Sequence, residues 1–367
     1  MKKIRALLAL FLCLVIFVAP VLAADETTAA TPDDASQSAD TSAEAAVSAA
    51  PEYHANAKAA LLIDLNTGRT IFEQNADEQV YPASLTKIMT CLLALENGNL
   101  SDTVTITENA YADLVSGSST ADLQVGEQLR LEDLLYCMMV ESGNEAANAV
   151  AEHIGGTIED FVKMMNERAY ELGCTHTHFM NPHGLHNESH YTTARDLSLI
   201  VQAALKSENF RTITNTAEYT LPATNLSDER VLKTTNMLIF QNSGNRYYYP
   251  RAHGIKTGYT TPAGRCVISA AKSSGMYLLG IICGAETTVL ETGDIQMESF
   301  PECINLFNYG FNNFSYVSVL SPLYPVAQVS VLNSAGAEAV AVSPKDDIQI
   351  LLPNGYDESQ LDVNIEL

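Results

Sequence analysis

Three short segments carry side chains suited to nucleophilic chemistry on a carbonyl group. The first is Ser84-Leu85-Thr86-Lys87, at the head of an apolar run. Residues three apart lie on one face of a helix, so the Lys87 amine can reach the Ser84 hydroxyl. A lysine buried among apolar neighbours can act as the base that activates a serine, because burial disfavours its charge. The simpler interpretation is a helix cap followed by a solvated lysine, and this motif alone does not decide.

A second Ser-x-x-Lys, Ser269-Ala270-Ala271-Lys272, provides an internal control. It lies in an expected strand, where side chains alternate between two faces, so its serine and lysine point to opposite sides. The spacing therefore indicates a catalytic pair only where the segment is helical.

The second segment, Ser142-Gly143-Asn144, lies in a break between two helical patterns. A hydroxyl and a carboxamide on one tight turn can relay a proton and hold a peptide C=O or N–H group. The motif is weak by itself, because Ser207-Glu208-Asn209 and Ser243-Gly244-Asn245 have the same form. A polar turn is the ordinary interpretation of any one of them.

The third segment, Lys256-Thr257-Gly258, occurs once in the chain. On a strand it places a cation and a hydroxyl along one edge, and Gly258 leaves room for another backbone to approach. This arrangement suits an extended peptide that ends in a carboxylate. The alternative is an ordinary edge-strand lysine.

The elements that would position these segments form an α+β pattern. Residues 59–74 read as two strands joined at Asn66-Thr67-Gly68, and residues 84–98 as a helix that stops at Asn97-Gly98. Further helices are expected at 131–140, 145–154, 158–172, 193–206 and around 292–310, and strands at 253–260, 265–272 and 276–284. Strands at both ends with helices between predict one antiparallel sheet flanked by helices, with an all-helical subregion.

The chain divides into four expected regions. Three cations precede the apolar run Ala6–Val18, and Val21-Leu22-Ala23 ends in small residues, so residues 1–23 are predicted to be a signal peptide and the protein to be exported. Residues 24–52 lack large apolar side chains and are predicted to be a disordered, acidic and Ala-rich linker. Residues 53–315 form the expected catalytic domain. Short β segments from residue 316 to 367 predict a small all-β domain.

Charge and cysteine content exclude some classes of function. The chain holds 20 Lys and Arg against 44 Asp and Glu, a formal net charge of −24, which argues against binding nucleic acid or anionic lipid through a basic surface. Six cysteines follow the leader, scattered through apolar segments, and are expected in the core rather than in a disulfide framework. The sequence leaves open whether one or two disulfide bridges form.

In their order and spacing the three motifs resemble those of the serine-type D-alanyl-D-alanine carboxypeptidases, the low-molecular-weight penicillin-binding proteins. The matching segments are PASLTKIMT (82–90), ESGNEAAN (141–148), THFMNPHGLH (177–186) and GIKTGYT (254–260), and the similarity runs from about Tyr53 to the C-terminus. The resemblance implies a β-lactamase/transpeptidase-like fold.

It also implies a substrate and a role for each motif residue. The substrate would be a peptidoglycan stem peptide ending in D-Ala-D-Ala, with β-lactam antibiotics as inhibitors and no cofactor. The implied roles are acylation of Ser84, general base for Lys87, proton transfer to the leaving amine for Ser142, substrate-amide binding for Asn144, carboxylate binding for Lys256 and Thr257 beside Gly258, and an oxyanion hole from the N–H groups of Ser84 and Tyr259.

Two departures from related patterns carry predictions. Class A β-lactamases use a glutamate in a Glu-x-x-Leu-Asn loop, and the nearest candidate, Glu218-Tyr219-Thr220-Leu221-Pro222, lacks the asparagine, so efficient β-lactamase activity is not expected. The family usually ends in an amphipathic helix that rests on the membrane. None is evident here, so either the sequence is truncated or the protein is soluble outside the cell. Truncation is expected, with membrane contact only through a missing C-terminal anchor. The other rival is a non-catalytic wall-binding or β-lactam-sensing protein of the same fold.

One histidine-rich stretch raises the possibility of a metal site. Cys174, His176, His178, His183, His186 and His190 lie within 17 residues, and zinc uses three or four ligands of these types. The family motif accounts for 181–185 without metal, as a loop beside the active site. The expectation is therefore no metal.

Overall fold

The computed structural model describes residues 14–15, 50–330, 339–357, 361 and 364–365. The predicted leader and linker lie outside these residues, apart from 14–15 and 50–52. The chain divides into two units, Glu52–Asn312 and a second made of Met1–Pro51 with Asn313–Leu367.

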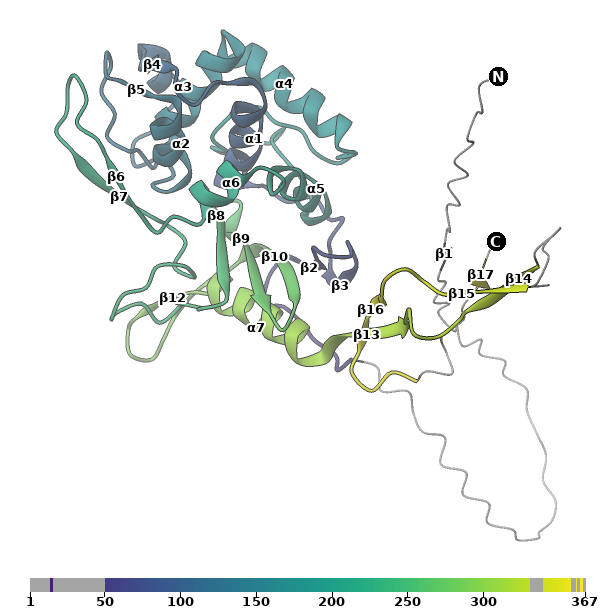
Figure 1. The fold of residues 1–367 in the computed structure, drawn as a ribbon. Helices are drawn as coiled ribbons and strands as arrows, with labels where there is room; N and C mark the ends of the chain where they lie inside the picture. The colour runs from purple at the N-terminus through teal and green to yellow at the C-terminus, as the bar shows by residue number, and fades with distance from the viewer. Residues whose placement is uncertain (1–13, 16–49, 331–338, 358–360, 362–363, 366–367) are drawn as a thin grey trace, which may run out of the picture. The chain divides into compact units, whose positions relative to one another are not determined.

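The larger unit is built on a five-stranded antiparallel sheet of order β3-β2-β10-β9-β8 (Figure 1). Its strands are β2 (Ala59–Asp64), β3 (Thr70–Gln74), β8 (Ala252–Thr260), β9 (Gly264–Ser273) and β10 (Met276–Ala285). The early hairpin pairs with the late strands through β2 and β10, where Leu61 lies opposite Ile281. This order places β8, which carries Lys256-Thr257-Gly258, at one edge of the sheet.

Helices cover both faces of this sheet, so every residue of β2 is buried. On one face lies α7 (Ser299–Asn313), where a Cβ on Gly310 would come within 2.8 Å of Leu62 and 2.7 Å of Leu278. On the other face α5 (Ala194–Ala204) packs against β2 and β10. Side chains alternate along β2, so Leu62 points toward α7. Leu61 and Ile63 point to the other face and belong to the core shared with the other helices.

The remaining helices form a cluster around α1 (Figure 1). They are α1 (Lys87–Asn97), α2 (Leu131–Met139), α3 (Asn144–Gly155), α4 (Ile158–Glu171) and α6 (Glu208–Thr214), with the 3₁₀ turns η1 (Ala83–Thr86) and η2 (Glu108–Tyr111). Two-stranded ribbons accompany them, β4 (Thr103–Thr105) with β5 (Gln128–Arg130) and β6 (Glu218–Leu221) with β7 (Arg230–Lys233). Residues 87–94 of α1 are all buried, so the helix that follows Ser84 is a core element.

These elements confirm the predicted α+β class, with three local corrections. The helix expected at 84–98 begins with η1, and Ser84 lies in that 3₁₀ turn rather than in the α-helix. Gly98 ends α1 in an extended conformation, not a left-handed one; a Cβ there would meet Leu131 at 2.6 Å, so packing requires the glycine. The helix expected around 292–310 begins only at Ser299, because β11 (Thr287–Val289) and β12 (Ile295–Met297) form a hairpin before it.

The second unit holds short antiparallel pairs of strands. β13 (Phe314–Leu320) pairs with β16 (Ile348–Pro353), β14 (Ala327–Ser330) with β15 (Ala339–Val342), and β1 (Leu14–Val15) with β17 (Asn364–Ile365). These β segments agree with the all-β character expected of the C-terminal region.

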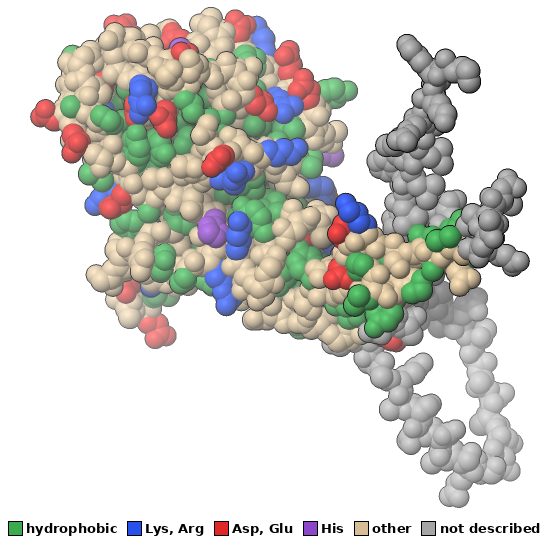
Figure 2. Space-filling model, in the orientation of Figure 1, with side chains coloured by type: hydrophobic (Ala, Val, Ile, Leu, Met, Phe, Trp, Pro, Cys, Tyr) green, Lys and Arg blue, Asp and Glu red, His purple; other side chains and the backbone are tan. Residues whose placement is uncertain are grey.

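The charged side chains and the cysteines lie where the composition predicts them, at the surface and in the core. On the face drawn in Figure 2, acidic and basic side chains lie interspersed over the helical part. All six cysteines from Cys91 to Cys303 are buried and free, which confirms their expected place in the core. In the described part of the chain, no helix has the length and apolarity needed to cross a membrane.

Candidate active site

The Ser84 hydroxyl and the Lys87 amine meet where η1 passes into α1. Lys87 Nζ lies 3.0 Å from Ser84 Oγ, although the two residues belong to different helical types. The Lys87 side chain is completely buried. Two further oxygens contact its amine, Asn144 Oδ1 at 2.6 Å and the His183 carbonyl at 2.8 Å. The solvated lysine of the simpler interpretation is therefore wrong.

These contacts fit a neutral amine. Burial lowers the pKa of Lys87 well below its ordinary value of 10.5, the nearby charge of Lys256 lowers it further, and Glu145 opposes the shift. A neutral amine has two N–H groups and one lone pair. The carbonyl oxygens of Asn144 and His183 can only accept hydrogen bonds, so in a neutral amine they would take the two N–H groups and leave the lone pair for the Ser84 hydroxyl.

A second buried lysine organises the opposite wall. Lys256 Nζ donates to Ser142 Oγ at 3.0 Å and to the Thr257 carbonyl at 3.2 Å. Burial lowers the pKa of Lys256 to about 7. Ser142 has φ of +67°, and this turn aims its hydroxyl at β8 just before α3 begins at Asn144. The structure thus joins the second and third sequence motifs through one hydrogen bond.

A hollow of about 600 Å³ opens over these groups. It is lined by six of the eight predicted site residues: Ser84, Ser142, Asn144, Thr257, Gly258 and Tyr259. The other two, Lys87 and Lys256, are buried beneath it and bond to lining residues. All eight therefore meet at one place.

Gly258 admits another backbone, as the sequence predicted, but that backbone belongs to the same chain. A Cβ on Gly258 would lie 3.0 Å from the Pro82 carbonyl oxygen and 3.1 Å from the Ser84 nitrogen. The glycine therefore lets β8 approach the turn that carries the serine. Ser84 and residues of β8 therefore line the same hollow.

Sequence reasoning missed Thr235 and the contact that His183 makes, although it placed residues 181–185 in a loop beside the active site. Thr235 lines the hollow, and its hydroxyl lies 2.6 Å from that of Thr257. His183 supplies the carbonyl that binds Lys87. Thr235 belongs to no motif in the sequence, and a backbone carbonyl leaves no signal in residue type, so only the tertiary structure reveals either contact.

His176, His178, His183 and His190 bond to other protein groups rather than to one another, and the His186 ring packs against Tyr81. His183 Nε2 lies 2.9 Å from Asp113 Oδ2, and its Nδ1 accepts from the Leu185 N–H. His190 Nε2 lies 2.8 Å from the Thr86 hydroxyl. Among the described residues, no group of three or more His, Cys, Asp or Glu side chains is placed to hold a metal ion. These bonds shape the loop that borders the hollow.

Gly184 in this loop carries a testable prediction. Its φ is +91°, and a Cβ there would lie 1.8 Å from the Ala83 carbonyl oxygen, beside Ser84. Gly184→Ala is expected to lower the free energy of unfolding by about 3 kcal/mol or more and to displace the serine turn. Gly68→Ala is the matched control, since Gly68 has φ of +76° with nothing within 4 Å, and strain alone costs about 1 kcal/mol. Equal losses in urea unfolding would contradict the close contact.

Comparison with known proteins agrees with this geometry. The sequence pattern of the D-alanyl-D-alanine carboxypeptidase family, peptidase S11, matches residues 44–287. This chain belongs to that family. D-alanyl-D-alanine carboxypeptidase DacF of Bacillus subtilis is 33% identical over 316 residues, which cover 85% of this chain and 76% of the relative. The resemblance inferred from the motifs is confirmed, and the protein is a serine-type hydrolase of this family.

Solved structures give the same result for the fold. The Streptomyces K15 DD-transpeptidase superposes with a TM-score of 0.63 at 31% identity, covering 71% of this chain and 99% of that one. Penicillin binding protein 5 from Haemophilus influenzae gives 0.66 at 29% identity, covering 83% and 85%. The predicted transpeptidase-like architecture is confirmed.

The candidate β-lactamase glutamate lies away from the hollow. Glu218 is exposed at the start of β6, with its carboxylate 3.9 Å from Lys233 Nζ. It does not line the hollow that contains Ser84.

Proposed function

We propose that this protein is an exported D,D-carboxypeptidase that removes terminal D-Ala from peptidoglycan stem pentapeptides through an acyl-enzyme on Ser84. The single observation that carries the proposal is the buried Lys87 amine, held by two acceptors with its third contact on the Ser84 hydroxyl. The leader pattern of residues 1–23 supports export.

In the acylation step, Lys87 takes the proton of Ser84 as Oγ attacks the penultimate D-Ala carbonyl. The new C–O bond converts that carbonyl into a tetrahedral oxyanion, which the N–H groups of Ser84 and Tyr259 would stabilise. Asn144 would hold the substrate amide while it also holds Lys87. Asn144 could reach the substrate amide because its side chain lines the hollow.

Departure of terminal D-Ala requires a proton on its nitrogen. Ser142 would pass to it the proton that Lys87 took from Ser84, which leaves Lys87 neutral again; the Ser142 hydroxyl borders the hollow and bonds to the Lys256 amine. Lys256 and Thr257 would bind the terminal carboxylate, with Thr235 holding the Thr257 hydroxyl. The C–N bond then breaks, and D-Ala leaves as the free amino acid.

Water completes the cycle by hydrolysing the ester on Ser84, with Lys87 again able to accept a proton. β-Lactams would acylate the same serine, because their strained amide and carboxylate stand in for the penultimate carbonyl and the C-terminus. Every group in this scheme belongs to the chain, the substrate or water, so the scheme requires no cofactor.

The test is D-alanine release by the full chain from a diacyl-L-Lys-D-Ala-D-Ala peptide, with and without EDTA. Release that EDTA leaves unchanged is the expected result. Release abolished by EDTA and restored by zinc would favour a metallo-carboxypeptidase. Acylation by penicillin without D-alanine release would favour a β-lactam-sensing protein, and rapid nitrocefin turnover would favour a β-lactamase.

A further inference from the structure

Glu145 is a buried carboxylate that the proposed mechanism does not use. It follows Asn144 in the first turn of α3 and is completely buried. Its Oε1 accepts hydrogen bonds from the backbone N–H groups of Ala121 at 2.6 Å and Leu123 at 3.5 Å. Its Oε2 is buried with no hydrogen-bond partner among the described residues. A charge-bearing group with one oxygen unsatisfied is costly, which suggests a role beyond packing.

The bonds of Glu145 fix one wall of the hollow. Residues 115–119 line the hollow, and the chain then runs directly into the segment that Glu145 holds. The N–H of Asn144 donates to the Ser119 carbonyl at 2.9 Å, so two consecutive residues of α3 secure this loop. The Asn144 side chain meanwhile binds Lys87. The first turn of α3 therefore connects the hollow's wall to the amine beside Ser84.

Glu145 is also the anion that acts on Lys87. Its charge raises the pKa of Lys87 against the larger effects of burial and of Lys256 on β8. Neither lysine forms an ion pair within the described chain, since both contact neutral oxygens. From the loop after α4, His183 faces Lys87 and is itself bonded to Asp113.

Charged side chains also lie in this region, since Glu127 and Arg230 act on the same Tyr111 and Cys137 groups as Glu145 does. Tyr111 of η2 and Cys137 of α2 lie near enough for the charge of Glu145 to raise the pKa of each. Burial raises the pKa of Glu145 itself, while the N–H groups of Ala121 and Leu123 and the Lys87 amine favour its charged form.

We propose that Glu145 is a positioning residue for the reaction at Ser84, which through the first turn of α3 ties the 115–119 wall to the Asn144 side chain that holds Lys87. The proposal rests on the proposed function. Because an anion favours the protonated lysine, removing it should free the neutral amine at lower pH. Loss of the backbone bonds should instead loosen the wall and weaken substrate binding.

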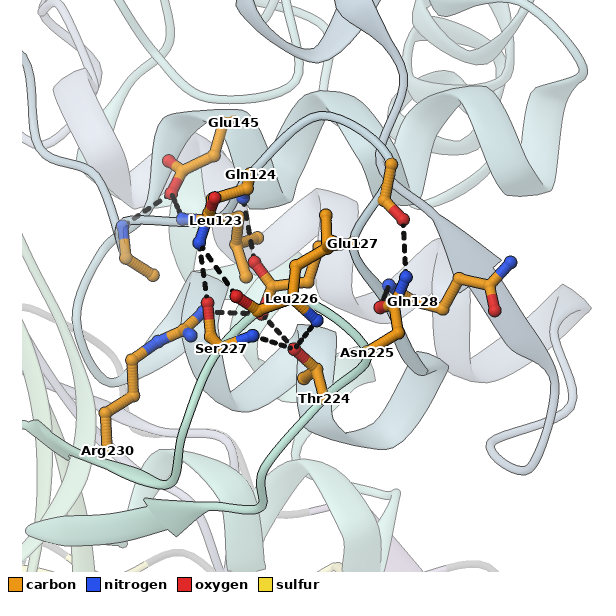
Figure 3. Close-up of polar contacts among 12 residues, drawn as sticks. Leu123, Gln124, Glu127, Gln128, Glu145, Thr224, Asn225, Leu226, Ser227 and Arg230 are labelled. Atoms are coloured by element: carbon orange, nitrogen blue, oxygen red, sulfur yellow. Dashed lines mark hydrogen bonds and ion pairs between the residues drawn. The ribbon is translucent and has the colours of Figure 1, made fainter.

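The chain offers a matched control in Glu127, at the other end of the same loop (Figure 3). Glu127 is also completely buried and accepts a backbone hydrogen bond, from Gln124 at 2.8 Å. Unlike Glu145, it forms an ion pair with Arg230 at 3.1 Å and accepts from the Thr224 hydroxyl at 2.9 Å. Its charge is therefore balanced locally, and it anchors the loop without acting on Lys87.

The test compares kcat/KM for D-alanine release across pH in wild type, Glu145→Gln, Glu145→Asp and Glu127→Gln. Glu145→Gln keeps an oxygen for the N–H groups of Ala121 and Leu123 but loses the negative charge. The acid limb of its kcat/KM profile, where activity falls as Lys87 is protonated, should therefore move to lower pH by about 1 unit. Glu145→Asp keeps the charge but has a shorter reach, so KM should rise while the limb stays close to that of the wild type. Glu127→Gln should leave the limb in place.

Two outcomes would overturn the proposal. An unmoved limb in an active Glu145→Gln enzyme would show that the carboxylate is only structural, and an equal shift in Glu127→Gln would show a non-specific effect of loosening the loop. If Glu145→Gln fails to fold by circular dichroism, the KM of Glu145→Asp decides, and a KM equal to that of the wild type overturns the proposal. Failure of the proposed function is distinguishable, because wild type would then release no D-alanine at any pH.

Discussion

Ser84→Ala is expected to lower D-alanine release from a D-Ala-D-Ala peptide by on the order of 10⁴-fold or more. The acyl-enzyme cannot form without the hydroxyl, and the hollow can then only bind substrate. Binding should survive, because Asn144, Thr257 and Tyr259 still line the hollow. The measurement is kcat from a coupled D-alanine assay, with peptide affinity followed by calorimetry.

Ser269→Ala is the matched control for this substitution. Ser269 belongs to the second Ser-x-x-Lys, on β9, where its hydroxyl donates to the Gly254 carbonyl at 2.6 Å. Its side chain is buried, whereas Lys272 is exposed and lies over the Tyr277 ring, so the two do not pair. The variant should lose about 1 kcal/mol of stability and keep its activity. Equal activity in Ser84→Ala and Ser269→Ala would contradict the mechanism in which Ser84 is the nucleophile.

Lys87→Met is expected to lower kcat by about 10²- to 10⁴-fold, because methionine fills a similar volume but has no amine to accept the serine proton. Combined with Ser84→Ala it should cost little more, since the two groups act as one unit. Lys87→Arg should fail to restore activity, because a guanidinium stays protonated. Rescue by arginine would mean that a positive charge, not a base, is needed at this position.

The same variant has a signature in stability. The folded-state pKa of Lys87 lies well below that of the unfolded chain, so unfolding takes up a proton at pH values between the two. The stability of the wild type should therefore rise with pH up to about 10.5, and Lys87→Met should lose the Lys87 part of this slope while keeping the part that Lys256 contributes. Urea unfolding at a series of pH values measures the difference. Parallel slopes would indicate that Lys87 is charged in the folded protein.

Local patterns were enough to predict most of the fold. Alternation and turn residues located β2 and β3, and apolar periodicity located α2 to α5, because these elements depend on burial of one or both faces. Several short elements were not predicted. The helix α6 has seven residues, too few for a clear period, and β11 and β12 have three residues each. Residues near 292 therefore read as the start of α7.

The candidate site was predicted as a set of residues but not as a set of contacts. Residue type and spacing pointed to Ser84, Lys87, Ser142 and Lys256, and the resemblance supplied their roles. The bond between Lys256 and Ser142 joins residues 114 positions apart, and that between Lys87 and Asn144 joins residues 57 apart. Only the packing of α1, α3 and β8 brings them together. Glu145 carried no signal in sequence, because its function depends on a loop that precedes it by more than twenty residues.

The most direct test of the central claim is mass spectrometry of the full chain after brief exposure to benzylpenicillin. The account predicts one covalent adduct per chain, located by peptide mapping on the peptide that contains Ser84 and absent from Ser84→Ala. An adduct on any other residue, or none on a folded wild-type chain, would contradict the assignment of Ser84 as the nucleophile.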